Sequence, residues 1–243
     1  MNLIIDVGNT SVKIAVFQVD ELLEKVTCSL EEFEINFENL LKKYPRISKS
    51  IVSSVGLLSN MQLDTIKKRL HVLVLNAEIP LPFINDYKTP HTLGVDRIAL
   101  VSAAVKKYPN QNILIIDAGT CVTYDFITNQ NQYLGGAISP GIRLRYTSLN
   151  NLTANLPLLT KEVPEMIIGN TTNSAIHSGV IYGVLFEIDG VIQTYKEKYS
   201  DLTVILTGGD INFLSKQLKS SIFAHSNFLL EGLNHILQYN SNE

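Results

Sequence analysis

A short segment that occurs twice limits the folds open to this 243-residue chain. Leu3–Gly8 reads LIIDVG and Leu114–Gly119 reads LIIDAG, and a second strand-like run follows each copy, at Ser11–Phe17 and Cys121–Ile127. A glycine permits a tight turn between two strands, so each copy predicts a strand–turn–strand hairpin. The repeat predicts two lobes of similar build that face each other across a cleft. A ligand site is expected in this cleft, because ligand pockets prefer domain interfaces.

Apolar runs of strand length alternate with longer helical patterns along the chain, which is typical of an α/β fold. Strands are expected at Leu3–Asp6, Val12–Phe17, Ile51–Val55, Val72–Leu75, Ile113–Ile116, Val122–Ile127 and Leu202–Leu206. Helices are expected at Leu30–Lys43, Gln62–Leu70, Asp96–Lys107, Ala175–Tyr195 and Leu229–Leu237. We place the first lobe at residues 1–111 and the second at residues 112–243. Whether the C-terminal helix packs back on the first lobe stays open.

Charge and cysteine content exclude several classes of protein. The 20 basic and 23 acidic residues give a net charge of −3 and form no basic stripe, so nucleic acid is not an expected partner. The longest apolar runs have strand length, and the N-terminus has no basic region ahead of an apolar stretch. Neither a membrane span nor a secretory signal is therefore expected. Cys28 and Cys121 form no CxxC pair, which suits a reducing cytoplasm.

The first hairpin turn carries groups suited to phosphate. Gly8 lets the backbone approach a ligand closely, and the hydroxyls of Thr10 and Ser11 can donate to phosphate oxygens. Lys13, on the following strand, can neutralise phosphate charge. A plain turn with an exposed lysine explains the same residues, and for this motif alone that alternative stays open.

The second hairpin, Asp117–Thr123, repeats the pattern. Two acidic, glycine-containing turns suit a nucleotide with its cation, because carboxylates hold hard metal ions and backbone amides hold phosphates. Gly135–Gly141 and Thr207–Asp210 also offer bare backbone to a ligand, although tight strand packing and an ordinary turn explain them as well. The chain has neither GxxxxGK[ST] nor GxGxxG, so it predicts no P-loop or Rossmann site.

The segment Tyr87–Arg97 lies between the lobes and leads into an apolar helix. Asp96 falls at the start of this helix, where the helix dipole favours a carboxylate, so a capping role is one interpretation. The adjacent Arg97 and the polar loop before it indicate a small polar ligand. An aspartate can accept the hydroxyl proton when a phosphoryl group is transferred to an alcohol. Asp96 is therefore the candidate base.

Taken together, these residues resemble the signature of the type III pantothenate kinases. The family motifs are DxGNT with a following lysine, YxxPxxLGxDR, DxGTxxT, GGxIxPG and TGG. All are present in this order, at Asp6–Lys13, Tyr87–Arg97, Asp117–Thr123, Gly135–Gly141 and Thr207–Gly209. The Tyr87–Arg97 block is the most specific, because looser forms of the others occur across the wider actin-like kinases.

The resemblance implies an actin-like fold of two RNase H-like lobes and ATP-dependent phosphorylation of pantothenate to 4′-phosphopantothenate, the first step of coenzyme A synthesis. It implies K⁺ or NH4⁺ at Asp117, Mg²⁺ that arrives with ATP, and Asp96 as the base that takes the proton of the primary hydroxyl. ATP would be bound by Asp6, Val7, Gly8, Asn9, Thr10, Ser11, Val12, Lys13 and Thr120. Pantothenate would be bound by Tyr87, Gly94, Val95, Asp96, Arg97 and Thr172.

The resemblance also implies a homodimer. When the chain is aligned on Gly169 and Gly179, Thr172 takes the place of the family threonine that reaches pantothenate from the neighbouring subunit. Thr171 stands beside it, so either hydroxyl is a candidate.

Two rival functions are retained. One is a kinase of the same fold for another small alcohol or acid, and the Tyr87–Arg97 block argues against it. The other is a non-catalytic regulator, since relatives with this fold were first described as accessory factors for gene expression. The intact Asp6, Asp96 and Asp117 argue against that alternative.

Overall fold

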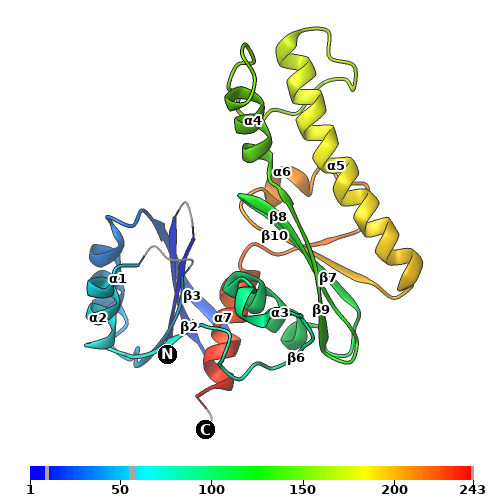
Figure 1. Cartoon of the computed structure of the whole chain (residues 1–243). Coiled ribbons are helices and arrows are strands. Elements are labelled where there is room, and N and C mark those ends of the chain that lie inside the picture. The colour runs from blue at the N-terminus through cyan, green and yellow to red at the C-terminus, as the bar shows by residue number, and fades with distance from the viewer. Residues whose placement is uncertain (9–10, 55–57, 242–243) are drawn as a thin grey trace. The chain divides into compact units, whose positions relative to one another are not determined.

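The structure is a computed structural model that describes residues 1–8, 11–54 and 58–241 (Figure 1). The chain divides into two compact units. Unit 1 comprises Met1–Pro109, Asn131–Tyr133 and Asn227–Glu243. Unit 2 comprises Asn110–Gln130 and Leu134–Ser226.

Unit 1 is built on a sheet with the strand order β3-β2-β1-β4-β5. Its strands are β1 (Asn2–Val7), β2 (Val12–Gln18), β3 (Glu21–Cys28), β4 (Lys49–Ser54) and β5 (His71–Val74). The strands β1, β2 and β3 pair antiparallel, and β4 and β5 continue the sheet parallel to β1. A short strand, β6 (Ile84–Asn85), lies outside this sheet and pairs with Gln132–Tyr133.

Helices cover both faces of this sheet. On one face, α1 (Phe33–Lys43) and α2 (Asn60–Lys67) pack over a core that includes Leu3, Ile5 and Val7 of β1. The other helices, α3 (Val95–Lys107) and α7 (Phe228–Tyr239), pack against each other and also contact β4; α7 contacts β1 as well (Figure 1, green and red). Successive strand residues point to opposite faces, so the side chain of Asp6 points to the α3 and α7 side.

Unit 2 has a sheet of the same order, β9-β8-β7-β10-β11. The strands are β7 (Ile113–Ala118), β8 (Cys121–Ile127), β9 (Gln132–Pro140), β10 (Thr203–Thr207) and β11 (Phe223–Ala224). As in unit 1, the first hairpin is antiparallel and the next two strands continue parallel to its first strand. The short repeat seen in the sequence is therefore part of a repeat of the whole sheet.

The helices of unit 2 are α4 (Ile142–Asn151), α5 (Thr172–Lys198) and the short α6 (Ile211–Leu214). They bury Leu114, Ile116 and Ala118 of β7, which correspond in register to Leu3, Ile5 and Val7 of β1. One window of α5 has a mean hydropathy of 1.4, and the helix is long enough to cross a membrane. Its apolar residues instead form much of the core of unit 2, and this packing accounts for its composition.

The expected α/β class, with two sheets, is confirmed, and each expected strand and helix has a counterpart. The sequence reading omitted β3, β6, β9 and β11. In β3, charged and polar residues interrupt the apolar pattern, because much of the strand is exposed. Residues 227–243, which the sequence-based boundary places in the second lobe, belong to unit 1, since the apolar face of α7 packs on α3 and β1.

Candidate active site

Asp6 lies at the end of β1, directly opposite Lys13 on β2 and Ser53 on β4. Its side chain is almost fully buried, and the Lys13 Nζ lies 3.4 Å from Asp6 Oδ2. Burial, together with the negative charge of Asp96, raises the pKa of the Asp6 carboxyl by more than the charge of Lys13 and the hydrogen bonds from Lys13 and Ser53 lower it. Asp6 is therefore a carboxylate whose charge its protein neighbours balance only in part.

The turn after Asp6 is closed by a hydrogen bond in which the Gly8 N–H donates to the Ser11 carbonyl oxygen, at 3.1 Å. The side chains of Val7 and Val12 are buried in the core beneath α1 and α2. Any role of these two valines in ATP binding falls to their backbone. Asn9 and Thr10 lie outside the described residues.

Asp96 stands in the first turn of α3, and its Oδ1 accepts a hydrogen bond from the Arg97 N–H at 2.9 Å. Gly94 lies two residues before Asp96, and a Cβ on Gly94 would overlap the Asp96 Oδ1. The capping role and the role as a base therefore both have support. The Asp96 carboxylate accepts a hydrogen bond from an N–H in the first turn of the helix, and it also stays partly exposed. Its negative charge raises the pKa of Asp6, which places the two carboxylates in one neighbourhood of unit 1.

An aromatic stack holds Arg97 and Tyr87 together. The Arg97 guanidinium lies 5.5 Å from the centroid of the Tyr87 ring, and this ring stacks on Tyr133 at 6.1 Å with an interplanar angle of 22°. The ring of Phe83 packs edge-on against the ring of Tyr133, with the two centroids 6.0 Å apart. Tyr133 is fully buried, and the pairing of β6 with Gln132–Tyr133 places it. The Tyr87–Arg97 block thus packs on buried aromatic rings, and Arg97 itself is 5% exposed.

In unit 2, Asp117 occupies the position on β7 that Asp6 occupies on β1, opposite Thr123 on β8 and Thr207 on β10. Gly208 has a φ of 97°, and a Cβ there would overlap the Asp117 Oδ1 and the Ala118 carbonyl oxygen. Only glycine therefore lets this backbone pack against the Asp117 carboxylate.

The glycine motifs of unit 2 meet at the β7–β8 turn. The Gly141 N–H donates to the Thr120 carbonyl oxygen at 3.1 Å, and the Asp210 N–H donates to the Ala118 carbonyl oxygen at 2.9 Å. The side chain of Thr120 is exposed at this turn. Gly136 has a different role, because a Cβ there would overlap the backbone of Tyr124. For Gly136, tight strand packing is the correct interpretation.

Three residues of these sites carried no signal in the sequence reading. Ser53 contacts Asp6 because parallel strands end at the same edge of a sheet, and Tyr133 lies under Tyr87 through a strand pairing distant in sequence. Lys161 forms an ion pair with Asp210 and lies 5.5 Å from the centroid of the Phe213 ring. Of the three, only Ser53 lies in a strand that the sequence predicts, Ile51–Val55.

Among the described residues, no three His, Cys, Asp or Glu side chains cluster to form a metal site by themselves. The donors at Asp6 and Asp117 are carboxylate oxygens beside serine or threonine positions. Such oxygens fit hard cations that complete their coordination with phosphate, carbonyl or water oxygens.

At the start of α5, the structure distinguishes Thr171 from Thr172. The Thr171 Oγ1 accepts a hydrogen bond from the Ser174 N–H at 3.1 Å, and the Thr171 N–H donates to the Ser174 Oγ at 2.9 Å. This reciprocal cap engages Thr171. Thr172 instead lines a groove of about 570 Å³ between α4 and α5, together with Arg145, Leu149, Leu156, Ile176 and Val180.

Known proteins are similar to this chain in sequence and in fold. A family model described as type III pantothenate kinase matches residues 2–194. A type III pantothenate kinase from Christiangramia forsetii is 55% identical over 243 residues, which is 100% of each chain. Among solved structures, a protein described as a Baf family transcriptional activator from Campylobacter jejuni has a TM-score of 0.65 at 21% identity, over 99% of this chain and 100% of that one.

A glucokinase from an Antarctic psychrotroph has a TM-score of 0.53 at 12% identity, over 98% of each chain. At such identities the solved structures bear on the fold alone, and they show that this chain shares the fold of both proteins. The family match and the identity over the full chain show more: this chain belongs to the type III pantothenate kinase family.

Proposed function

We propose that this protein transfers the γ-phosphoryl group of ATP to the primary hydroxyl of pantothenate, giving 4′-phosphopantothenate for coenzyme A synthesis. The observation that carries the proposal is the position of Asp96. This partly exposed carboxylate lies near the buried Asp6, on the same helix turn as Arg97. Membership of a family of kinases supports the choice of substrate and reaction.

In this proposal Asp96 accepts the proton of the pantothenate hydroxyl as the phosphoryl group is transferred. The Arg97 N–H holds one carboxylate oxygen, Oδ1, and this bond fixes the direction of the side chain. The transition state of phosphoryl transfer is loose, so correct positioning of the hydroxyl counts for more than a strong base. Tyr87, Gly94, Val95 and Arg97 bind pantothenate, whose carboxylate suits the guanidinium of Arg97.

ATP is bound by the turn Asp6–Lys13, with Gly8 giving close backbone approach. The side chain of Lys13 is 42% exposed, so its ammonium can move from Asp6 to a phosphate oxygen. Mg²⁺ arrives with ATP and fits the oxygens of Asp6, while K⁺ or NH4⁺ fits Asp117. Bound there, the cations would neutralise charge on the phosphates. We assign contact with the nucleotide to Thr120 as well.

A homodimer forms part of the proposal, with Thr172 reaching the substrate of the partner subunit. The segment between α4 and α5 supports it, because it exposes a run of apolar side chains. Their exposed fractions are 61% for Leu158, 53% for Val163, 57% for Met166, 59% for Ile167 and 77% for Ile168. Exposed apolar surface of this kind marks interaction sites in proteins.

We further propose a cytoplasmic location and no nucleic-acid or membrane partner. The net charge of −3 without a basic stripe supports the absence of nucleic-acid binding. The packing of α5 into the core of unit 2 supports the absence of a membrane partner.

The test is an assay of the purified protein with ATP, Mg²⁺, K⁺ and pantothenate. We expect ADP and phosphopantothenate in equal amounts, and loss of turnover when Na⁺ replaces K⁺. Turnover of another small alcohol in place of pantothenate would reject the substrate. No turnover of any acceptor would favour the regulatory alternative. Sedimentation of the same sample tests the homodimer.

A further inference from the structure

The C-terminal helix α7 carries none of the motifs and lies beyond residues 2–194, which the family model matches. It nevertheless contacts the two elements that carry Asp6 and Asp96. Asp6 lies on β1 and Asp96 lies in the first turn of α3, and α7 packs against both elements.

The backbone of α7 approaches that of α3 closely at Gly232. Gly232 is buried on α7, and a Cβ there would overlap the Ala99 carbonyl oxygen and lie 3.2 Å from the Ala103 Cβ. Ala99 follows Asp96 by one helical turn. The distance between the two helices at this level is therefore set by the missing side chain of Gly232.

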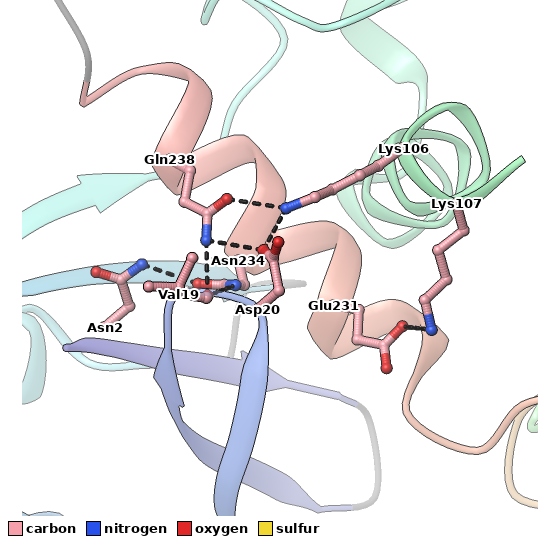
Figure 2. Close-up of polar contacts among 8 residues, drawn as sticks. All are labelled: Asn2, Val19, Asp20, Lys106, Lys107, Glu231, Asn234 and Gln238. Carbon is pink, nitrogen blue, oxygen red and sulfur yellow. Dashed lines mark hydrogen bonds and ion pairs between the residues drawn. The ribbon is translucent and has the colours of Figure 1, made fainter. Parts of the chain in front are cut away.

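The contact of α7 with β1 includes a hydrogen bond to a buried amide. Asn234, 2% exposed, accepts a hydrogen bond from the Asn2 Nδ2 at 2.8 Å and donates one to the Val19 carbonyl oxygen at 2.8 Å (Figure 2). Asn2 begins β1, which carries Asp6 one residue before its end, and the two residues lie on the same face of the strand.

Further polar contacts fix the far end of α3 to the same helix. Lys106 contacts Asp20 and also donates to the Gln238 Oε1 at 3.0 Å, while Lys107 pairs with Glu231 at 2.6 Å (Figure 2). Gln238 in turn donates to the Val19 carbonyl oxygen at 2.7 Å. The middle of α3, at Ala99 and Ala103, and its C-terminal end, at Lys106 and Lys107, thus both contact α7.

We propose that α7, through Gly232 and Asn234, is the positioning element that sets Asp96 relative to Asp6. This inference rests on the proposed role of Asp96 as the base. Gly232 and Asn234 touch neither substrate nor nucleotide in this proposal. They affect the reaction only by fixing the positions of α3 and β1.

The test is a double-mutant cycle of Gly232→Ala with Asp96→Asn. The added methyl group has to separate α7 from α3, so we expect kcat to fall at least tenfold in the wild-type background, because small misplacements of reacting groups are costly. In the Asp96→Asn background, where the base is already lost, we expect the same substitution to change kcat by less than about twofold. Gly190→Ala on α5, where a Cβ meets no heavy atom within 4 Å, is the matched control and should leave kcat unchanged.

Equal falls in kcat in both backgrounds, or a lower Tm with normal kcat, would show a merely structural role and overturn the proposal. Should Gly232→Ala not fold, Asn2→Ala carries the test, because it removes only the bond between β1 and Asn234. We expect a two- to fivefold fall in kcat for Asn2→Ala that disappears in the Asp96→Asn background, and a wild-type kcat would reject the proposal. Wild-type turnover by Asp96→Asn alone would instead reject the base itself, which separates failure of the proposed function from failure of the positioning role.

Discussion

Asp96 lies near enough to Asp6 for its negative charge to raise the pKa of the buried Asp6 carboxyl. The two residues are far apart in sequence and come from a strand and a helix start. Two carboxylates gathered without a metal ion repel each other, and such perturbed groups cluster at functional sites. This relationship suits a site that binds a cation with its substrate.

The substitution Asp96→Asn is expected to lower kcat about 10²- to 10⁴-fold, since it removes the proton acceptor while keeping the size of the side chain. The fold should persist, because the amide oxygen can still accept the Arg97 N–H. Steady-state kinetics and circular dichroism check both statements. Asp86→Asn, which changes an exposed carboxylate in the segment before Tyr87, is the control and should retain full turnover. Normal kcat in Asp96→Asn would contradict the assignment.

The raised pKa of Asp6 predicts a conflict between stability and function. Because the folded-state pKa lies above the usual value of 3.8, the ionised carboxylate destabilises the fold above the raised pKa. This destabilisation vanishes as the pH falls below 3.8. Asp6→Asn should therefore raise the Tm of the ligand-free protein at pH 7 and abolish turnover with ATP.

Thermal melts of wild type and Asp6→Asn between pH 7 and pH 4 measure this difference directly, and the gap in Tm should narrow toward the acid end. A variant that is less stable than wild type at pH 7 would show that Lys13 and Ser53 compensate fully for burial. Lys13→Met is a useful partner measurement, since it removes the charge that lowers the pKa of Asp6 and should destabilise the protein at pH 7.

Tyr87 is predicted to act through its ring. Tyr87→Phe keeps the stack on Tyr133 and the contact with the Arg97 guanidinium, so the KM for pantothenate should change little if the hydroxyl makes no bond to substrate. Tyr87→Leu removes both ring contacts and should raise this KM roughly fivefold, equivalent to ~1 kcal/mol for a cation–π contact. The KM for ATP serves as the internal control, and an equal rise there would place Tyr87 outside the pantothenate site.

Most of the fold could be predicted from the sequence because the repeat Leu3–Gly8 and Leu114–Gly119 marks the first strand of each sheet. Buried strands such as β1 and β7 have continuous apolar runs, which reveal them without other information. The edge strand β3 has no such run, because all its residues except Cys28 are exposed or only partly buried. The placement of α7 in unit 1 depends on long-range packing against α3 and β1, which no local pattern encodes.

The candidate site divides in the same way. Asp6, Asp96 and Asp117 could be found from the sequence motifs in which they stand. The residues that pack against the site, in contrast, could not be found from motifs. Tyr133 lies under Tyr87 only because β6 pairs with Gln132–Tyr133, a long-range pairing that the sequence does not announce.

The pair Gly208 and Gly209 provides a test of the nucleotide site within one motif. Gly208→Ala has to displace the Ala118 carbonyl or the Asp117 carboxylate and adopts an unfavourable φ, so we expect both a lower Tm and a loss of K⁺-dependent activity. At Gly209 an added Cβ meets no heavy atom within 4 Å, so Gly209→Ala should keep the Tm of the ligand-free protein. If ATP rests on this backbone, Gly209→Ala should raise the KM for ATP alone. An unchanged KM would place the nucleotide elsewhere.

Thr171 and Thr172 should respond oppositely to the same substitution. Thr171→Ala removes the cap of α5 and is expected to cost about 1 kcal/mol of unfolding free energy, while the KM for pantothenate stays close to wild type. Thr172→Ala leaves the cap intact and should keep the Tm, but it removes the hydroxyl proposed to reach the partner's substrate and should raise the KM for pantothenate. Denaturant melts and steady-state kinetics on both variants separate the two roles.

Since a partner's hydroxyl can act only in an assembled dimer, the dimer itself can be tested with Ile168→Glu. This substitution places a charge on the exposed apolar segment and should weaken dimerisation and raise the KM for pantothenate. A monomeric Ile168→Glu variant with a normal KM would show that each chain completes its own site.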